Sequence, residues 1–212
     1  MLLKTTQQFL KELHRIGAIK IDTKEGFRLT LHDKNPHAPL SPIYINLRTV
    51  RNPKPGPLGK EHVESIANDI NSAVQKAHMS FDCITGIPRA GTPFAESFLS
   101  LREKLGNPTK LIRMKKRPQG SRALRVDGSY VIRTKDEYRP RVLLIDDLIT
   151  SATTKWTAID AVRRAGYEVA GIAVYLDREQ GGLSKLKASG IPIVAALKFS
   201  DMLRYYGESN II

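Results

Sequence analysis

The chain has 212 residues, a formal net charge of +13 and one cysteine. A single cysteine excludes an internal disulfide, and the length leaves room for one α/β domain with appended elements. The basic charge favours anionic partners, either nucleic acid or phosphate metabolites, unless it only solvates the surface. No apolar run is long enough for a membrane helix, and the first eight residues turn polar too early for a signal peptide, so we expect a cytoplasmic protein without membrane contact.

The first fifty residues are expected to form a helix and a small appended hood. Thr5 and Gln8 have the spacing of a capping box, apolar residues then share one helical face, and Gly17 supplies a stop. Alternation over residues 27–31 predicts a strand of the hood, and alternation over residues 41–48 predicts a half-buried strand. The segment between these two strands contains prolines and is expected to be a loop.

Beyond residue 60 the pattern changes to strands that alternate with helices. Apolar residues recur at helical spacing from Val63 to Ala77, a second helix is expected from Pro93, and a third is expected from about Thr153 to a stop at Gly166. Strands are expected at residues 81–85, where Cys83 would be a core residue, 110–114, 142–148 and 169–176. Near-continuous apolar strands of this kind indicate an α/β fold with a doubly wound, mostly parallel sheet.

Two adjacent acids, Asp146 and Asp147, end one of these strands, and ligands of parallel sheets bind at the carboxyl ends of strands. Carboxylates suit the hydroxyls of a ribose, while the N–H groups and hydroxyls at the next helix start suit a phosphate. A metal-binding acid pair, or a helix cap beside two solvated acids, would also explain the pair alone. Residues 142–154 as a whole predict a sugar-phosphate site, with a phosphate turn of Thr150, Ser151, Ala152, Thr153 and Thr154.

Two further segments are candidates for binding anions. Residues 86–93 follow a strand, and their turn exposes N–H groups that suit pyrophosphate, with Arg89 to strengthen the binding. A plain strand-to-helix turn is the alternative. Residues 110–125 carry seven Lys and Arg side chains, which are too dense for a core and therefore face either solvent or a polyanion.

The thirteen residues 142–154 resemble the phosphoribosyl pyrophosphate signature of the type I phosphoribosyltransferases, with Ala152 where that family usually has Gly. Within the family, residues 27–31, 41–48 and 176–182 resemble the hood, the early strand and a post-strand loop of orotate phosphoribosyltransferases, including the form fused into uridine monophosphate synthase. The similar segments extend from the first helix to the last strand. The resemblance therefore covers nearly the whole chain.

This resemblance implies the type I phosphoribosyltransferase fold in one domain of residues 1–212, to which residues 1–50 contribute the N-terminal helix and hood. It implies transfer of ribose 5-phosphate from phosphoribosyl pyrophosphate to orotate, with Mg²⁺ carried by the pyrophosphate rather than by the protein, in a homodimer with shared active sites. The implied catalytic residues are Asp146, Asp147, Lys115, Lys116 and Arg117. Phosphoribosyl pyrophosphate would contact Arg113, Arg89, Ala90, Gly91, Thr150, Ser151, Ala152, Thr153 and Thr154, and orotate would contact Arg178 and Phe27.

Residues 110–125, the basic segment, depart in sequence from the corresponding loop of the family, and two alignments of the segment with that loop stay open. Counting from Arg113 places Met114 at the second basic position and Arg117 at a later lysine, whereas anchoring on Asp127 slides the register by about one residue and favours Lys115 and Lys116. Three rival functions also stay open. They are transfer to another base, a catalytically weakened relative, and a regulator that binds nucleic acid, a partner that we do not expect because aromatic residues do not interleave with the basic run.

Overall fold

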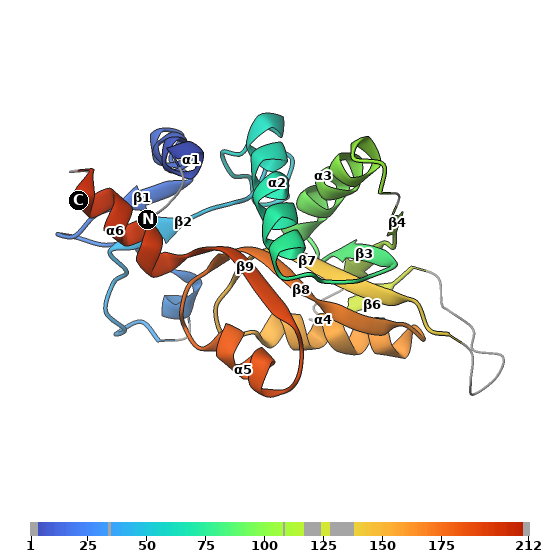
Figure 1. Cartoon of the computed structure of the whole chain (residues 1–212). Coiled ribbons are helices and arrows are strands. Elements are labelled where there is room, and N and C mark those ends of the chain that lie inside the picture. The colour runs from blue at the N-terminus through green and yellow to red at the C-terminus, as the bar shows by residue number, and fades with distance from the viewer. Residues whose placement is uncertain (1–3, 34, 108, 117–123, 128–137, 210–212) are drawn as a thin grey trace. The chain divides into compact units, whose positions relative to one another are not determined.

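The chain folds into two units. The computed structural model (Figure 1) describes residues 4–33, 35–107, 109–116, 124–127 and 138–209. The larger unit consists of residues 60–199, and the smaller unit combines residues 1–59 with residues 200–212. Each unit buries apolar side chains of its own, such as Leu143 in the larger unit and Leu10 in the smaller one.

A parallel sheet forms the centre of the larger unit. Its strand order in the described part of the chain is β4-β3-β7-β8-β9, and all neighbouring strands are parallel. A parallel sheet covered on both faces requires continuous apolar strands, and the central strand β7 meets this need because Val142 to Ile145 are fully buried. The strands are β3 (Cys83–Gly86), β4 (Lys110–Leu111), β7 (Arg141–Ile149), β8 (Glu168–Asp177) and β9 (Ile193–Lys198).

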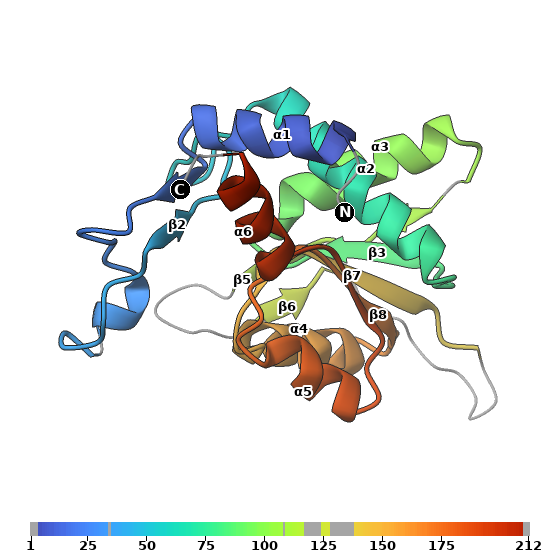
Figure 2. The same ribbon diagram turned by 60° about the vertical axis from the view of Figure 1, so that its left-hand side comes forward.

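Helices cover both faces of this sheet. Figures 1 and 2 show α2 and α3 on one face and α4 and α5 on the other. Apolar residues at helical spacing, such as Val63, Ile66 and Ile70 of α2, supply the buried side of each layer. The doubly wound α/β fold predicted from the sequence is confirmed. The helices are α2 (Lys60–Lys76), α3 (Gly91–Lys104), α4 (Thr153–Arg164) and α5 (Gly182–Ala188).

An antiparallel strand pair adds to the larger unit. β5 (Met114–Lys116) pairs with β6 (Leu124–Val126), with Met114 opposite Val126. Met114 and Leu124 are buried in the same apolar cluster as Ile159 of α4. This pair therefore holds the ends of the basic segment against the core.

The smaller unit contains the first and last helices, α1 (Lys4–Arg15) and α6 (Phe199–Glu208), whose first residue, Phe199, still belongs to the larger unit. The buried Tyr206 hydroxyl of α6 donates a hydrogen bond of 2.9 Å to the Leu10 carbonyl oxygen of α1. β1 (Ile19–Ile21) pairs antiparallel with β2 (Ile43–Ile45), so the strand predicted at residues 41–48 is present but shorter. The first and last helices are thus joined in one unit.

The prediction of a hood strand at residues 27–31 is wrong for all of these residues except the first. Phe27 forms only an isolated bridge to Ser41, and Thr30–Asp33 is a 3₁₀ helix, η1. The cause is the buried His32 ring, whose Nδ1 accepts the Leu29 N–H at 2.8 Å and whose Nε2 lies 3.2 Å from the Pro39 carbonyl oxygen. These bonds curl the backbone instead of extending it.

Other boundaries also differ from the sequence prediction. α1 begins at Lys4, so Thr5 lies inside the helix and is not its cap. The single strand expected at residues 110–114 is divided between β4 and β5, because the backbone stays on β3 only through Ile112, whose N–H donates to the Ile84 carbonyl oxygen at 2.8 Å. β1, β6, α5, β9 and α6 were not predicted.

Candidate active site

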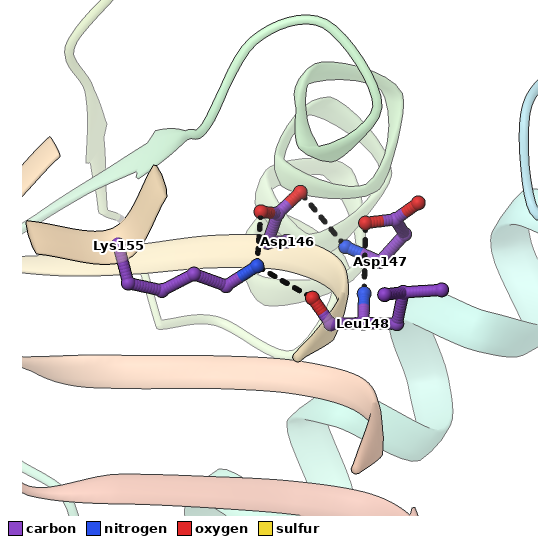
Figure 3. Close-up of polar contacts among 4 residues, drawn as sticks. All are labelled: Asp146, Asp147, Leu148 and Lys155. Carbon is purple, nitrogen blue, oxygen red and sulfur yellow. Dashed lines mark hydrogen bonds and ion pairs between the residues drawn. The ribbon is translucent and has the colours of Figure 1, made fainter. Parts of the chain in front are cut away.

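The first acid at the carboxyl end of β7, Asp146, is held by a buried ion pair (Figure 3). Asp146 is 5% exposed, and its Oδ2 lies 2.7 Å from Nζ of Lys155, which is 6% exposed in the first turn of α4. Lys155 Nζ also donates to the Leu148 carbonyl oxygen. Asp146 Oδ1 accepts the N–H of Asp147 at 3.0 Å. Both carboxylate oxygens of Asp146 are therefore engaged within the protein.

The second acid, Asp147, is half-buried, and its Oδ1 accepts the Leu148 N–H at 2.8 Å. Exclusion of water, followed by the repulsion of the neighbouring Asp146 carboxylate, raises the pKa of Asp147 to about 7. Its carboxylate points away from Lys155 (Figure 3). No described residue binds its other oxygen, Oδ2, so Asp147 is the acid with an oxygen to offer a ligand.

The phosphate turn follows the acids and begins α4. The side chains of Ser151, Thr153 and Thr154 are exposed, with Ser151 Oγ 3.3 Å from Thr153 Oγ1. The first N–H groups of a helix have no partner within it and carry partial positive charge. Ala152 is buried with φ at 67°, a left-handed conformation that costs a non-glycine residue roughly 1–2 kcal/mol. The turn thus presents hydroxyl and N–H donors to an anion in a backbone shape that glycine favours.

The loop after β3 lies directly against the acid pair. Gly86 is in register with Ile145, and the Ile87 N–H donates to the Ile145 carbonyl oxygen at 2.9 Å. A Cβ on Gly91 would lie 3.0 Å from both Cα and Oδ1 of Asp146, so only glycine permits this approach. α3 begins at Gly91 and not at the predicted Pro93, because Ala90 already has helical dihedral angles. Arg89 is exposed.

A cavity of about 390 Å³ brings the two predicted anion-binding segments together in the larger unit. One wall is the loop after β3 with the start of α3, and the other is the stretch from Leu111 to Lys116. An acid, Glu96, also lines it. The cationic lining residues are Arg89, Arg113, Lys115 and Lys116. Their convergence creates a positive surface next to the end of β3.

The basic segment presents its lysines outward. Met114 is buried at 5% exposure, whereas Lys115 and Lys116 are exposed. Lys115 Nζ lies 2.6 Å from Asp127 Oδ2, and this hydrogen bond lowers the pKa of Asp127. The Asp127 N–H also donates to the Arg113 carbonyl oxygen at 2.7 Å. The remaining predicted catalytic residue of this segment, Arg117, lies outside the described residues.

Arg178 follows β8, beside the end of β7. Its N–H donates to the Ile149 carbonyl oxygen at 3.0 Å, and the Gly182 N–H donates to the Thr150 carbonyl oxygen at 2.8 Å. The Arg178 guanidinium is half-buried, with its central carbon 5.6 Å from the centroid of the Phe199 ring. Its Nε finds no hydrogen-bond partner among the described residues. Burial lowers the pKa of Arg178, but a guanidinium keeps its charge in proteins.

Phe27, predicted to contact orotate, belongs to the smaller unit. It is half-buried, and its ring centroid lies 6.0 Å from that of Tyr44. All other predicted site residues that the structure describes belong to the larger unit. There, three strand-end loops meet, after β3, β7 and β8.

Comparison with known proteins identifies the family of the chain. Residues 54–193 match the family described as phosphoribosyl transferase domain. The orotate phosphoribosyltransferase of Sulfurisphaera tokodaii is 31% identical over 175 residues, which cover 82% of this chain and 79% of that protein. This chain belongs to the orotate phosphoribosyltransferase family. As a member of this family it is a pentosyltransferase of pyrimidine biosynthesis.

Solved structures of known proteins share the fold of this chain. UMP synthase of Leishmania donovani matches with a TM-score of 0.70 at 25% identity, covering 98% of this chain and 39% of that one. The chain therefore spans about two fifths of that longer protein. Orotate phosphoribosyltransferase of Aeropyrum pernix matches in fold with a TM-score of 0.65 at 21% identity, covering 94% and 98% of the two chains. The type I fold expected from the sequence is confirmed.

The described residues of this orotate phosphoribosyltransferase family member contain neither a helix suited to a membrane nor a cluster of metal ligands. None of its helices there has the length and apolar character needed to cross a bilayer. In the same residues, no three His, Cys, Asp or Glu side chains gather as metal ligands. Asp146, the first acid of the pair, is bound to Lys155.

Lys155 is the site residue that the sequence prediction missed. A signal was present, because position 155 lies on the same helical face as Ile159 and Val162, both of which are buried. A lysine on an apolar stripe is almost never fully buried unless it is paired. The nearest upstream carboxylates were those of the acid pair.

Proposed function

We propose that this chain transfers ribose 5-phosphate from phosphoribosyl pyrophosphate to orotate, with orotidine 5′-monophosphate and pyrophosphate as products. The observation that carries the proposal is the meeting of three loops at one edge of the sheet. The loop after β7 supplies an acid pair and a helix N-terminus with exposed hydroxyls. The loop after β8 supplies a half-buried arginine whose Nε has no partner among the described residues. These groups suit a ribose, a phosphate and a carboxylate, respectively.

At the reacting carbon, the bond from ribose C1 to the pyrophosphate oxygen breaks and the bond to an orotate nitrogen forms, while the proton of that nitrogen passes to the departing pyrophosphate. The C1 carbon becomes electron-poor as pyrophosphate leaves, so negative groups near the ribose stabilise the transition state. Asp147 would accept hydrogen bonds from the ribose hydroxyls through its uncommitted oxygen. Asp146 would support it from behind through the Asp147 N–H.

The 5-phosphate would bind at the start of α4. Its oxygens would accept hydrogen bonds from the exposed hydroxyls and from the first N–H groups of the helix. Ala152 takes part through its backbone, which already has the left-handed conformation. The residues proposed for this contact are Thr150, Ser151, Ala152, Thr153 and Thr154.

Pyrophosphate would be held in the basic cavity. The loop residues Arg89, Ala90 and Gly91 would approach it from one side, and Arg113, Lys115, Lys116 and Arg117 from the other. Because Met114 is buried, the exposed Lys115 and Lys116 are the better candidates for the mobile cations, with Lys115 exchanging Asp127 for the leaving group. Mg²⁺ would arrive on the pyrophosphate as part of the substrate, neutralising its charge, with no ligand from the protein.

Orotate would bind between the ribose site and Arg178. A guanidinium matches a planar carboxylate with two parallel hydrogen bonds, and the Phe199 ring beside it limits its movement. We propose that Phe27 contributes from the smaller unit, so that residues 1–212 work as one domain with the hood in residues 1–50. We also propose a cytoplasmic homodimer with shared active sites, to be checked by sedimentation equilibrium.

A panel of bases tests the activity. The purified chain, supplied with phosphoribosyl pyrophosphate and Mg²⁺, should convert orotate and release one pyrophosphate per orotidine 5′-monophosphate, while adenine, hypoxanthine and uracil stay unreacted. Preference for another base would redirect the proposal to that base. Absence of turnover with every base, alongside retained phosphoribosyl pyrophosphate binding, would overturn it, and salt-sensitive nucleic-acid binding in that case would favour a regulator.

A further inference from the structure

Lys155 contacts both residues that flank Asp147. Its ammonium lies 2.7 Å from the Asp146 carboxylate and donates to the carbonyl oxygen of Leu148 (Figure 3). The stem of the side chain runs on the core side of α4, on the same face as the buried Ile159. A single cation from α4 therefore bridges the residue before Asp147 and the residue after it.

Backbone bonds complete this bridge. The Asp147 N–H donates to Asp146 Oδ1 at 3.0 Å, and the Leu148 N–H donates to Asp147 Oδ1 at 2.8 Å. These contacts leave one carboxylate oxygen of Asp147 as the free acceptor of the acid pair among the described residues. The two adjacent acids are consequently not equivalent, since one is a structural anion and the other faces a ligand.

We propose that Lys155 is a positioning residue for phosphoribosyl transfer. It neutralises the Asp146 carboxylate on one side of Asp147 and holds the Leu148 carbonyl oxygen on the other, so that only Asp147 presents a carboxylate oxygen to the ribose. The inference rests on the proposed function, because that function supplies the ribose. It differs from a catalytic role, since Lys155 touches no substrate atom and acts through the two acids.

The charge balance around Asp147 depends on this lysine. In the described part of the chain, the ionisable groups that act on Asp147 are Asp146 and Lys155. From α3 the neighbouring residue is Gly91, which has no side chain, and from β8 the register partners of Asp146 and Leu148 are Val174 and Leu176. Without Lys155, two adjacent carboxylates would remain with no cation, and the pair would retain a proton to higher pH.

The test compares Lys155→Met with Lys155→Arg, and with Arg163→Met as a matched control at an exposed position of the same helix. For Lys155→Met we expect the acidic limb of kcat/KM for phosphoribosyl pyrophosphate to move up by about one pH unit, with a loss of about tenfold at neutral pH. Lys155→Arg should recover most of this loss, and Arg163→Met should match the parent. The KM for orotate at saturating phosphoribosyl pyrophosphate should stay within about twofold of the parent value in every variant.

A folded Lys155→Met with an unchanged pH profile and an unchanged KM for phosphoribosyl pyrophosphate would overturn the proposal. If Lys155→Met does not fold, the double variant Lys155→Met with Asp146→Asn removes both buried charges. It should fold and return the acidic limb to that of the parent, and a limb that stays shifted would contradict the proposed role. If the parent turns over no base, calorimetric titration with phosphoribosyl pyrophosphate at several pH values decides the role of Lys155 separately from the proposed function.

Discussion

Asp146 and Asp147 are adjacent in the sequence, yet the fold treats them as different groups. Asp146 faces α4 and is neutralised by Lys155, whereas Asp147 points away from that cation and is half-buried with a raised pKa. The consequence is that the Asp147 carboxyl resists ionisation, although the proposed contact with the ribose uses its ionised form. A ligand with hydroxyl groups would relieve this cost by donating hydrogen bonds to the ionised form.

The raised pKa of Asp147 predicts how stability changes with pH. A carboxyl whose pKa is about 7 when folded and about 4 when unfolded stabilises the folded state below pH 4, and this contribution is lost as the pH rises through 7. Asp147→Asn carries no such charge, so the variant should be more stable than the parent at pH 8 and should lose this advantage by pH 4. Urea denaturation across this pH range measures the difference.

The same variant should lose activity although it gains stability at pH 8. An amide cannot supply the negative charge proposed for the ribose, so kcat/KM should fall by about 100-fold or more. Asp160→Asn, at an exposed position of α4, is the matched control. Near-parental activity of Asp147→Asn, or a stability advantage that grows toward acid pH, would contradict the assigned role.

At the scale of elements, the site depends on how closely α3 approaches β7. The helix begins at Gly91, where the backbone of the loop after β3 touches the strand end that carries Asp146. The start of α5 is equally close, because Gly182 donates to the Thr150 carbonyl oxygen of the phosphate turn. Glycines at two element boundaries thus bring three loops within reach of one small ligand.

Gly91→Ala tests this close approach. The added Cβ would collide with the Ile145 carbonyl oxygen and lie 3.0 Å from Asp146 Oδ1, so we expect a destabilisation of about 1–3 kcal/mol together with a raised KM for phosphoribosyl pyrophosphate. Chemical denaturation and steady-state kinetics measure the two effects. Gly207→Ala on α6, where a Cβ would meet nothing within 4 Å, is the control and should be neutral or slightly stabilising. Parental stability of Gly91→Ala would mean that the loop shifts freely.

At the scale of the whole molecule, the net charge of +13 and the basic cavity should make the binding of phosphoribosyl pyrophosphate sensitive to salt. Salt screens the attraction between exposed charges. The KM for phosphoribosyl pyrophosphate should therefore rise on the order of tenfold between about 0.05 and 0.5 M salt, and the KM for orotate, which carries fewer charges, should rise less. Steady-state kinetics at fixed pH measure both constants. Arg89→Gln should lessen this dependence on salt. Arg164→Gln, at the far end of α4, is the control and should leave it unchanged. A KM independent of salt would refute the expected role of the cavity.

Continuous apolar strands and helical spacing made the larger unit predictable from the sequence. β7, α2 and α4 show their pattern locally, and the acid pair and Arg178 lie at strand ends, where a parallel sheet gathers ligands. The roles predicted for the basic segment came only from the resemblance to the family, because no local sequence pattern distinguishes this segment from a solvated loop.

What escaped prediction depends on contacts between distant residues. The 3₁₀ helix η1 exists because His32 binds the backbone of Pro39, and α6 is tied to α1 by Tyr206 and the Leu10 carbonyl oxygen. β1 is only three residues long, too short for alternation to mark it. Lys155 could have been found from its helical face, but its partner became evident only once α4 packed beneath the end of β7.

The guanidinium of Arg178 has a consequence for discrimination between bases. Its Nε is already buried without an acceptor among the described residues, so a carboxylate on the base would supply the missing acceptor, and a base without one would leave this donor unpaired. An unpaired buried donor carries its full desolvation cost in the free protein, so a ligand that pairs it gains more than an ordinary exposed contact would give. On the role proposed for Arg178, uracil, which lacks that carboxylate, is expected to bind more weakly than orotate.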